Sequence, residues 1–105
     1  MVDDKNKIIE LLMDYISEVR AKGFEISAAY LFGSYAKGNA EEWSDIDIAL
    51  ISEDFEGNRF FDKEKIREAK FAIDYRISPF PYRPEDFTES WFARDEIVKH
   101  GIRVL

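Results

Sequence analysis

Two short stretches decide the fold of this chain: LFGSYAKG at residues 31–38 and SDIDI at residues 44–48. The first closes an apolar run and reaches Gly33, which is typical of a buried strand that turns into a helix. The second alternates, so that its isoleucines lie on one face of a strand while Asp45 and Asp47 lie on the other. The two stretches therefore predict a pair of strands, one ending in a glycine turn and one beginning with two carboxylates.

The turn at Gly33 and Ser34 suits an anion. Glycine has no Cβ, so backbone N–H groups can approach a phosphate closely, and the start of the following helix adds a partial positive charge. The Ser34 hydroxyl can donate a hydrogen bond to a phosphate oxygen. A tight turn at Gly33 and a helix cap at Ser34 would explain the same residues without any ligand. The aspartates decide between these two interpretations.

Asp45 and Asp47 stand two residues apart on a predicted strand, so both carboxylates point to the same side. In a cleft of low dielectric they would repel each other, and a divalent cation removes this conflict. Carboxylates are the hard oxygen ligands that Mg²⁺ prefers. We therefore predict that Asp45 and Asp47 bind metal. In two-metal phosphoryl chemistry the ions contact both the attacking and the leaving oxygen, so a third carboxylate is expected on a neighbouring strand.

Asp74 is our candidate for the third carboxylate. Residues 71–78 alternate between large apolar residues and smaller or polar ones, which predicts a strand, and Asp74 interrupts it. A buried carboxylate without a partner is costly, so a strand that carries one normally has a use for it. Asp54, Glu56 and Asp62 stay open as alternatives if the strand begins elsewhere.

The rest of the chain alternates helices and strands. The expected elements are a helix over 4–22, a strand over 25–32, a short helix over 34–40, a strand over 44–52, a helical segment over 62–70, a strand over 71–78 stopped by Pro79 and Pro81, a helix from Pro84 to just before Gly101, and a short strand over 102–105. This order predicts an α/β fold with a mixed sheet of about four strands flanked by helices. From the length we expect a single domain over residues 1–105.

Charge and composition narrow the set of partners. Twenty-two acidic and fifteen basic residues give a net charge of −7, which opposes the binding of a long nucleic acid. No apolar run approaches the roughly 20 residues needed to span a bilayer, and the first residues carry acids where a secretion signal needs bases. The chain has no cysteine, which is compatible with a reducing compartment. We expect a cytoplasmic protein that does not associate with membranes, and we leave its oligomeric state open.

The spacing GSxxxG at 33–38, followed by SDxD at 44–47, resembles the signature of the nucleotidyltransferase-fold, or polymerase-beta-like, superfamily. The short length, Lys37 and the sequence KHGI at 99–102 are similar to its minimal nucleotidyltransferase branch. The resemblance covers about residues 26–105. It implies a nucleotidyltransferase fold with the following roles: Gly33 and Ser34 contact the phosphates, Asp45 and Asp47 bind metal, and Asp74 contacts the metal and the attacking hydroxyl.

The same resemblance implies an activity and a partner. It implies an enzyme that uses ATP and two Mg²⁺ ions and moves AMP to a hydroxyl, typically a tyrosine of a HEPN-domain protein encoded nearby. The pair would form a toxin–antitoxin system with this chain as antitoxin. Two alternatives stay open: transfer to a small molecule, and a binding module that neutralises a partner by occlusion with little catalysis.

Several residues near the predicted site have two interpretations. Lys37 and Arg76 either contact the triphosphate or remain solvated surface charges. Tyr35 stacks on a base or packs locally. Aromatic residues favour protein interfaces, and we expect a set of them to be exposed at the rim of the cleft, where the partner binds: Trp43, Phe60, Phe61 and the segment 79–82.

Overall fold

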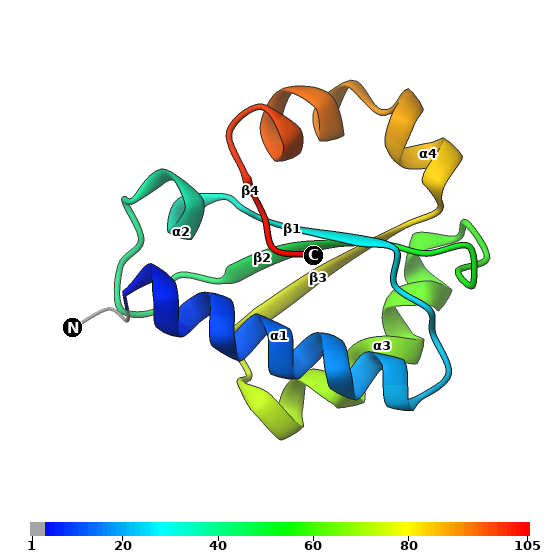
Figure 1. Cartoon of the computed structure of the whole chain (residues 1–105), viewed down its shortest axis with the longest axis horizontal. Helices are drawn as coiled ribbons and strands as arrows, with labels where there is room; N and C mark the ends of the chain where they lie inside the picture. The colour runs from blue at the N-terminus through cyan, green and yellow to red at the C-terminus, as the bar shows by residue number, and fades with distance from the viewer. Residues whose placement is uncertain (1–3) are drawn as a thin grey trace.

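Helices lie on both faces of a four-stranded sheet in the computed structural model, which describes residues 4–105 (Figure 1). In chain order the elements are α1 (Lys5–Ala21), β1 (Ala28–Phe32), α2 (Ser34–Lys37), β2 (Ile46–Ile51), α3 (Arg59–Ile73), β3 (Ile77–Tyr82), α4 (Pro84–Glu89), the π-helical turn η1 (Ala93–Val98) and β4 (Ile102–Arg103). The expected α/β fold with about four strands is confirmed. No helix in residues 4–105 has the length and apolar character needed to cross a membrane.

The sheet has the order β3-β2-β1-β4 and is mixed. β1 pairs with β2 and with β4 in antiparallel orientation, while β2 and β3 are parallel and joined by α3. The register places Phe32 opposite Asp47 on one side and Ser78 opposite Asp47 on the other. The start of β2 thus lies between the end of β1 and the start of β3.

Each face of the sheet has its own core, because β2 alternates. Ile46, Ile48 and Leu50 pack on the face that α1 and α3 cover, and Ala49 and Ile51 pack on the face beneath α4 and η1 (Figure 1). Asp47 belongs to the second face, at the point where the apolar core gives way to polar side chains. The same alternation that builds two cores therefore leaves Asp45 and Asp47 at one end of the second face.

The expected strand over 71–78 is wrong. α3 continues through Ile73, Asp74 caps it, and the strand begins only at Ile77. The alternating residues fit a helix as well, because Ile66, Ala69 and Ile73 recur at helical spacing and face the core. A short apolar run does not distinguish the two periods when the flanking helix is amphipathic.

The prolines that were expected to end this strand lie inside it. Pro79 and Pro81 belong to β3, which in the described chain pairs only with β2 and so forms an edge of the sheet. An edge strand has one row of N–H groups that no neighbour uses, and proline is tolerated there because it removes no ladder hydrogen bond. The C-terminal helix, expected as one piece, is divided into α4 and η1 at Ser90.

Candidate active site

The carboxylate of Asp47 packs directly against the backbone of Gly33. Gly33 has φ 75° and ψ −153°, a backbone conformation that residues other than glycine rarely adopt. A Cβ built on Gly33 would overlap Oδ2 of Asp47 and lie 3.2 Å from its Cγ. Glycine is therefore required twice at this position, once for the backbone conformation and once for the space that Asp47 fills.

Asp45 and Asp47 act on each other through their charges. The pKa of Asp47 is raised to about 6, first by burial and then by the negative charge of Asp45, while the positive charge of Lys63 lowers it. Asp45 is exposed, whereas Asp47 is partly buried. The pair thus presents one open and one sheltered carboxylate, and their mutual repulsion would be relieved by a cation.

The turn after β1 forms the short helix α2. Ser34 is its first residue and is half-buried, and the carbonyl of Gly33 accepts hydrogen bonds from the amides of Ala36 and Lys37. Gly38 ends the helix in the left-handed conformation, with φ 80°. Ser34 thus begins a helix directly after Gly33, the residue against which the Asp47 carboxylate packs.

Lys37 and Tyr35 hold α2 in place. The Lys37 Nζ lies 3.1 Å from Oε2 of Glu96 in η1, and Tyr35 is buried with its hydroxyl accepting a hydrogen bond from Arg76 Nη1 at 3.1 Å. Sequence reasoning left phosphate contact or solvation open for Lys37, and base stacking or packing for Tyr35. In the structure Lys37 pairs with a carboxylate, and Tyr35 packs in the core.

Asp74 does not lie on a strand beside the aspartate pair. Its two oxygens accept hydrogen bonds from the backbone N, Nε and Nη2 of Arg76 at 2.7 to 3.2 Å, and the side-chain hydrogen bonds from Arg76 are the main reason why its pKa is lowered. The Arg76 carbonyl accepts from the Ile46 amide at 2.9 Å. Asp74 and Arg76 together brace the start of β2 against α2, through Ile46 and Tyr35.

The residue of β3 that faces the site is Ser78. It is paired in register with Asp47, at the place where a third carboxylate was expected. Among residues 4–105, no group of three or more histidine, cysteine or acidic side chains could hold a metal ion. The strand argument that selected Asp74 therefore fails, and its assignment as a metal ligand stays a prediction. Recognising Ser78 from the sequence would have required accepting a strand with two prolines.

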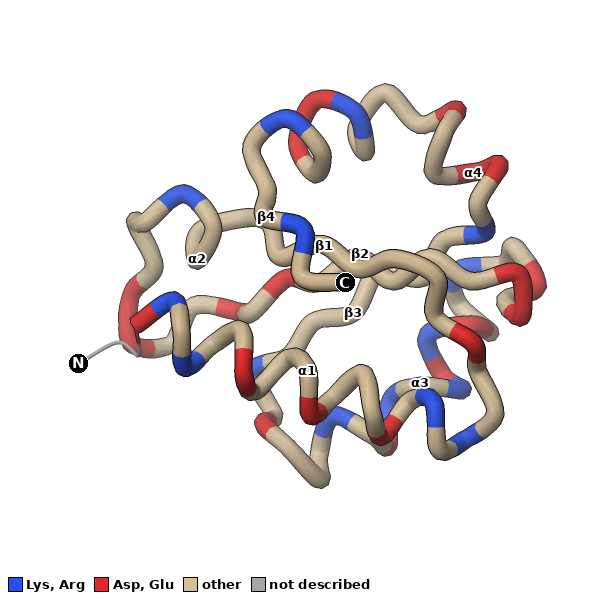
Figure 2. The backbone as a smooth tube through the Cα atoms, viewed as in Figure 1, with Lys and Arg blue, Asp and Glu red and all other residues tan. Residues whose placement is uncertain are grey.

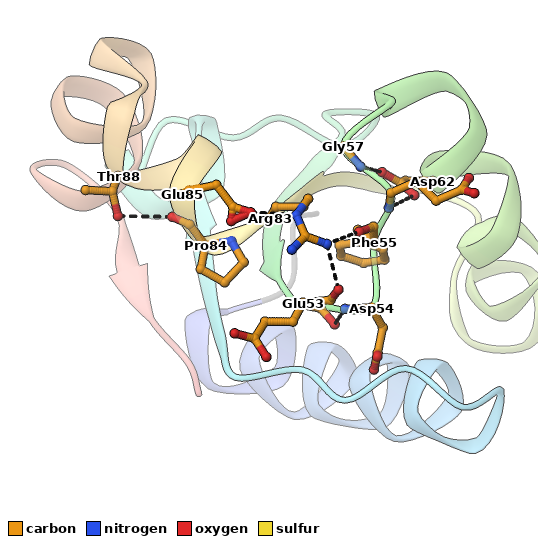
Figure 3. A network of polar contacts seen from close by, with 11 residues as sticks. Glu53, Asp54, Phe55, Gly57, Asp62, Arg83, Pro84, Glu85 and Thr88 are labelled. Atoms are coloured by element: carbon orange, nitrogen blue, oxygen red, sulfur yellow. Dashed lines mark hydrogen bonds and ion pairs between the residues drawn. The ribbon is translucent and has the colours of Figure 1, made fainter.

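The alternative carboxylates lie at the other end of β2. Asp62 is buried and accepts hydrogen bonds from the Glu56 and Gly57 amides (Figure 3). Asp54 accepts one from the Glu25 amide. Arg83 holds the same loop by donating to the carbonyls of Glu53 and Phe55. These carboxylates shape the loop after β2 and are excluded from the site at its start.

A hollow of the surface also lies at this far end. It measures about 830 Å³, and its lining includes Arg20, Glu25, Ser27, Asp54 and Pro84. None of the predicted site residues lines it. The hollow is therefore separate from the aspartate pair, which sits at an open surface.

Asp45 and Asp47 fit Mg²⁺ as a partial set of ligands. Mg²⁺ is commonly bound through one or two carboxylates, with substrate phosphates and water completing the octahedron. Two oxygen-bearing side chains of the same charge, one of them with a raised pKa, meet that requirement. The arrangement suits a metal that arrives with a phosphate-bearing substrate better than a metal enclosed by the protein alone.

A glycine turn packed against Asp47 of β2, with Asp45 directly before that strand, on a mixed sheet with helices on both faces, is typical of the nucleotidyltransferase class. The family described as "Polymerase beta, Nucleotidyltransferase" matches residues 6–104, and the chain belongs to this family.

Curated relatives carry names from the same class. The chain is 29% identical over 90 residues to the provisionally named protein adenylyltransferase MJ1305 of Methanocaldococcus jannaschii, covering 81% of this chain and 61% of the relative. It is 43% identical over 51 residues to the protein adenylyltransferase MntA of Shewanella oneidensis, covering 49% of this chain and 32% of the relative. The chain thus spans less than two thirds of the length of these relatives.

Solved structures share the fold. A provisionally named nucleotidyltransferase from Sulfolobus solfataricus aligns with a TM-score of 0.67 at 20% identity, covering 92% of this chain and 78% of that one. A toxin–antitoxin structure with AMP-PNP aligns at 0.64 and 21% identity, covering 92% and 72%. A mutant of the toxin–antitoxin MntA–HpeT with two Asp-to-Glu substitutions aligns at 0.57 and 25% identity, covering 98% and 73%.

Gly33→Ala should destabilise the protein more than Gly38→Ala. Both glycines have positive φ, but a Cβ at Gly38 meets nothing within 4 Å, whereas one at Gly33 overlaps Asp47. We expect Gly38→Ala to cost about 1 kcal/mol and Gly33→Ala about 2 to 4 kcal/mol in urea unfolding. Adding Asp47→Ala to Gly33→Ala should recover part of the difference. Equal losses for the two single variants would show that Asp47 does not press on Gly33.

Asp47 should make the metal-free protein less stable as the pH rises from 4 toward 6. Its pKa in the folded protein, about 6, lies above the value for an unfolded chain, so the folded state keeps a proton that the unfolded state has lost. The stability that this proton contributes is present at low pH and is lost as the pH rises through 6. Melting temperatures in EDTA should fall less with pH for Asp47→Asn than for wild type, and Asp14→Asn, an exposed change in α1, should behave as wild type. Parallel curves for Asp47→Asn and wild type would contradict the raised pKa.

Asp74→Ala should weaken the fold without abolishing Mg²⁺-dependent nucleotide binding. The substitution removes the Asp74 oxygens that accept hydrogen bonds from Arg76, and loss of hydrogen bonds to a charged group costs about 1.5 to 3 kcal/mol. Urea unfolding gives the stability, and calorimetry with Mg²⁺ and ATP gives the binding. An Asp74→Ala protein of normal stability that no longer binds Mg²⁺ and ATP would instead restore Asp74 as the third metal ligand.

Proposed function

We propose that this chain is a Mg²⁺-dependent nucleotidyltransferase that moves AMP from ATP to a hydroxyl of a partner protein. The observation that carries the proposal is the Asp45–Asp47 pair with Asp47 packed on Gly33. This contact brings the proposed phosphate-binding turn within van der Waals distance of the Asp47 carboxylate. A nucleoside triphosphate with its bound cation needs both in one place.

The residues of the chain position the triphosphate and shelter one side of it. The turn at Gly33 and Ser34 binds phosphate oxygens through its amides and the Ser34 hydroxyl, while Asp45 and Asp47 hold Mg²⁺. Mg²⁺ supplies neutralisation of the charge that develops on the phosphate oxygens. The acceptor hydroxyl then attacks the α-phosphorus in line with the bond to pyrophosphate, and pyrophosphate and a proton leave. Orientation of these groups provides much of the rate.

Adenine is the proposed base because relatives of this chain are named protein adenylyltransferases. The related toxin–antitoxin fold that was solved with AMP-PNP supports an adenine nucleotide as donor. Within residues 4–105 the aspartate pair sits at an open surface, and the neighbouring Trp43 is 75% exposed. Ligand sites usually bury most of their ligand, so a partner that covers the nucleotide fits this geometry.

A toxin is the proposed partner. The structural relative at 25% identity is the toxin–antitoxin MntA–HpeT, which supports a role for this chain as the antitoxin of such a pair. We propose that the toxin is a HEPN-domain protein and that the modified hydroxyl belongs to one of its tyrosines. The partner would then provide both the acceptor and the wall that the site lacks.

A second candidate function is supported by the composition of the site. Ser78 stands opposite Asp47 where a third carboxylate was expected, and Asp74 is held by Arg76. A site with two carboxylates could bind a nucleotide and a partner while transferring slowly, so that neutralisation occurs mainly by occlusion. The two functions differ in whether the partner becomes covalently labelled.

Transfer should require both aspartates. With α-labelled ATP, Mg²⁺ and the toxin encoded beside this chain, we expect the label on a partner tyrosine for wild type, and a fall of at least about 100-fold for Asp45→Asn and Asp47→Asn, because removal of one charged contact at the reacting phosphate is typically worth 10² to 10³ in rate. Asp95→Asn, an exposed change in η1, serves as the matched control. Neutralisation of the toxin without any label would support occlusion, and labelling of a small acceptor by the chain alone would contradict the protein acceptor.

A further inference from the structure

We propose that the acceptor-bearing segment of the partner lies along the free edge of β3 and the adjacent face of α3, and that this segment is acidic. The inference rests on the proposed transfer to a protein and names the chemistry of its substrate. It is carried by a line of basic side chains that the fold places beside the site and that no step of the proposed transfer uses.

Four basic residues form a stripe along α3: Arg59, Lys63, Arg67 and Lys70. Their spacing of four, four and three residues puts them on one face of the helix. Lys and Arg recur along α3 in a chain whose net charge is −7 (Figure 2). A concentration of positive charge on one helix face of an acidic protein favours a negatively charged partner at that face.

Aromatic rings fix the positions of these basic groups. Arg59 lies 5.2 Å from the ring centre of Tyr82, and Lys63 lies 5.6 Å from that of Phe80. Both rings belong to the core beneath α4 and η1, whereas α3 packs on the opposite face of the sheet. The two side chains therefore reach around the free edge of β3 toward the face that carries Asp47.

A small groove lies between α3 and β3. Lys63, Glu64, Arg67, Lys70 and Pro79 line it, and its volume is about 140 Å³. Glu64 is its single acidic residue and lies 3.7 Å from Arg67, with both side chains more than half exposed, which makes a weak pair. The groove thus offers three basic groups against one acid, in a space that suits carboxylate side chains.

The groove adjoins the proposed active site. Pro79 follows Ser78, and Ser78 is in register with Asp47. The charge of Lys63 is close enough to act on Asp47. A segment that lies along the groove would therefore pass beside the metal-binding pair, and a hydroxyl on it could reach the bound nucleotide.

The form of the edge indicates how the segment binds. Pro79 and Pro81 remove N–H groups from β3, so the partner cannot add a full strand to the sheet and must bind through side chains. Tyr82 and Phe80, with Phe71 on α3 itself, already carry cations, which leaves few ring faces for stacked bases. An acidic protein segment fits these constraints better than a single-stranded nucleic acid, which binds by stacking.

The prediction of an exposed aromatic surface at the cleft rim is thus partly wrong. Trp43, Phe60 and Phe61 are exposed, but Phe60 and Phe61 stand in the first turn of α3, next to Asp62 at the far end of β2, and not at the rim beside the aspartates. Pro79, Pro81 and Tyr82 are buried. The segment 79–82 contributes to the proposed docking surface an edge that lacks two backbone N–H donors, and α3 contributes the positive charge.

The test compares defined peptides on the whole chain. Fluorescent nine-residue peptides with a central tyrosine flanked by glutamates or by glutamines are titrated against wild type, Arg67→Glu/Lys70→Glu, and the matched control Lys5→Glu/Lys7→Glu on α1. At about 50 mM salt we expect the glutamate peptide to bind wild type at least about tenfold tighter than the glutamine peptide. The groove variant should lose that preference, and the control should keep it.

Two further measurements accompany the peptide titrations. Circular dichroism verifies that both double variants are folded, and calorimetry with Mg²⁺ and ATP tests the proposed nucleotide site separately. Equal binding of both peptides, an unchanged preference in the groove variant, or tighter binding of a single-stranded oligonucleotide than of the glutamate peptide would overturn the docking proposal. A wild type that prefers the glutamate peptide but does not bind Mg²⁺ and ATP would support the groove and contradict the proposed function.

Discussion

The contact between the Asp47 carboxylate and the bare backbone of Gly33 is the constraint on which the site depends. It joins β1 to β2 at the point where their register puts Phe32 opposite Asp47. Because a side chain at Gly33 would displace Asp47, the turn and the carboxylate must be chosen together. The proposed site for a triphosphate and its cation rests on this proximity, because amides suited to an anion and an oxygen suited to a cation lie close together.

A second layer of contacts keeps that proximity from relaxing. Arg76 holds Asp74, donates to the buried Tyr35 of α2 and accepts from the first amide of β2. Lys37 ties α2 to Glu96 in η1. These interactions connect the turn at Gly33 and the short helix α2 to the start of the strand that bears Asp47. Lys37 and Arg76, which the sequence left open as contacts of the triphosphate, thus make contacts within the protein that position α2 and the start of β2.

The strands of the site could be predicted from the sequence because their signals are local. Gly33 closes an apolar run, and the alternation around Asp45 and Asp47 has the period of a strand. The error at Asp74 has a physical origin, since residues 71–77 fit both a strand and the last turn of an amphipathic helix. The edge strand β3 contains two prolines that local rules assign to a loop, and only its free side explains why they are allowed. The sequence could not predict that Ser78 and Lys63 lie near the aspartates, because their placement depends on the position of β3.

The central claim is that Gly33, Asp45 and Asp47 form one site for a metal-bound nucleotide. The most direct measurement is isothermal titration of the wild-type chain with AMP-PNP in Mg²⁺ and again in EDTA. The account predicts a single binding event in Mg²⁺ that is lost in EDTA, because the carboxylates repel the triphosphate without the cation. Binding of equal strength with and without Mg²⁺ would show that the nucleotide does not meet the aspartate pair, and would contradict the account.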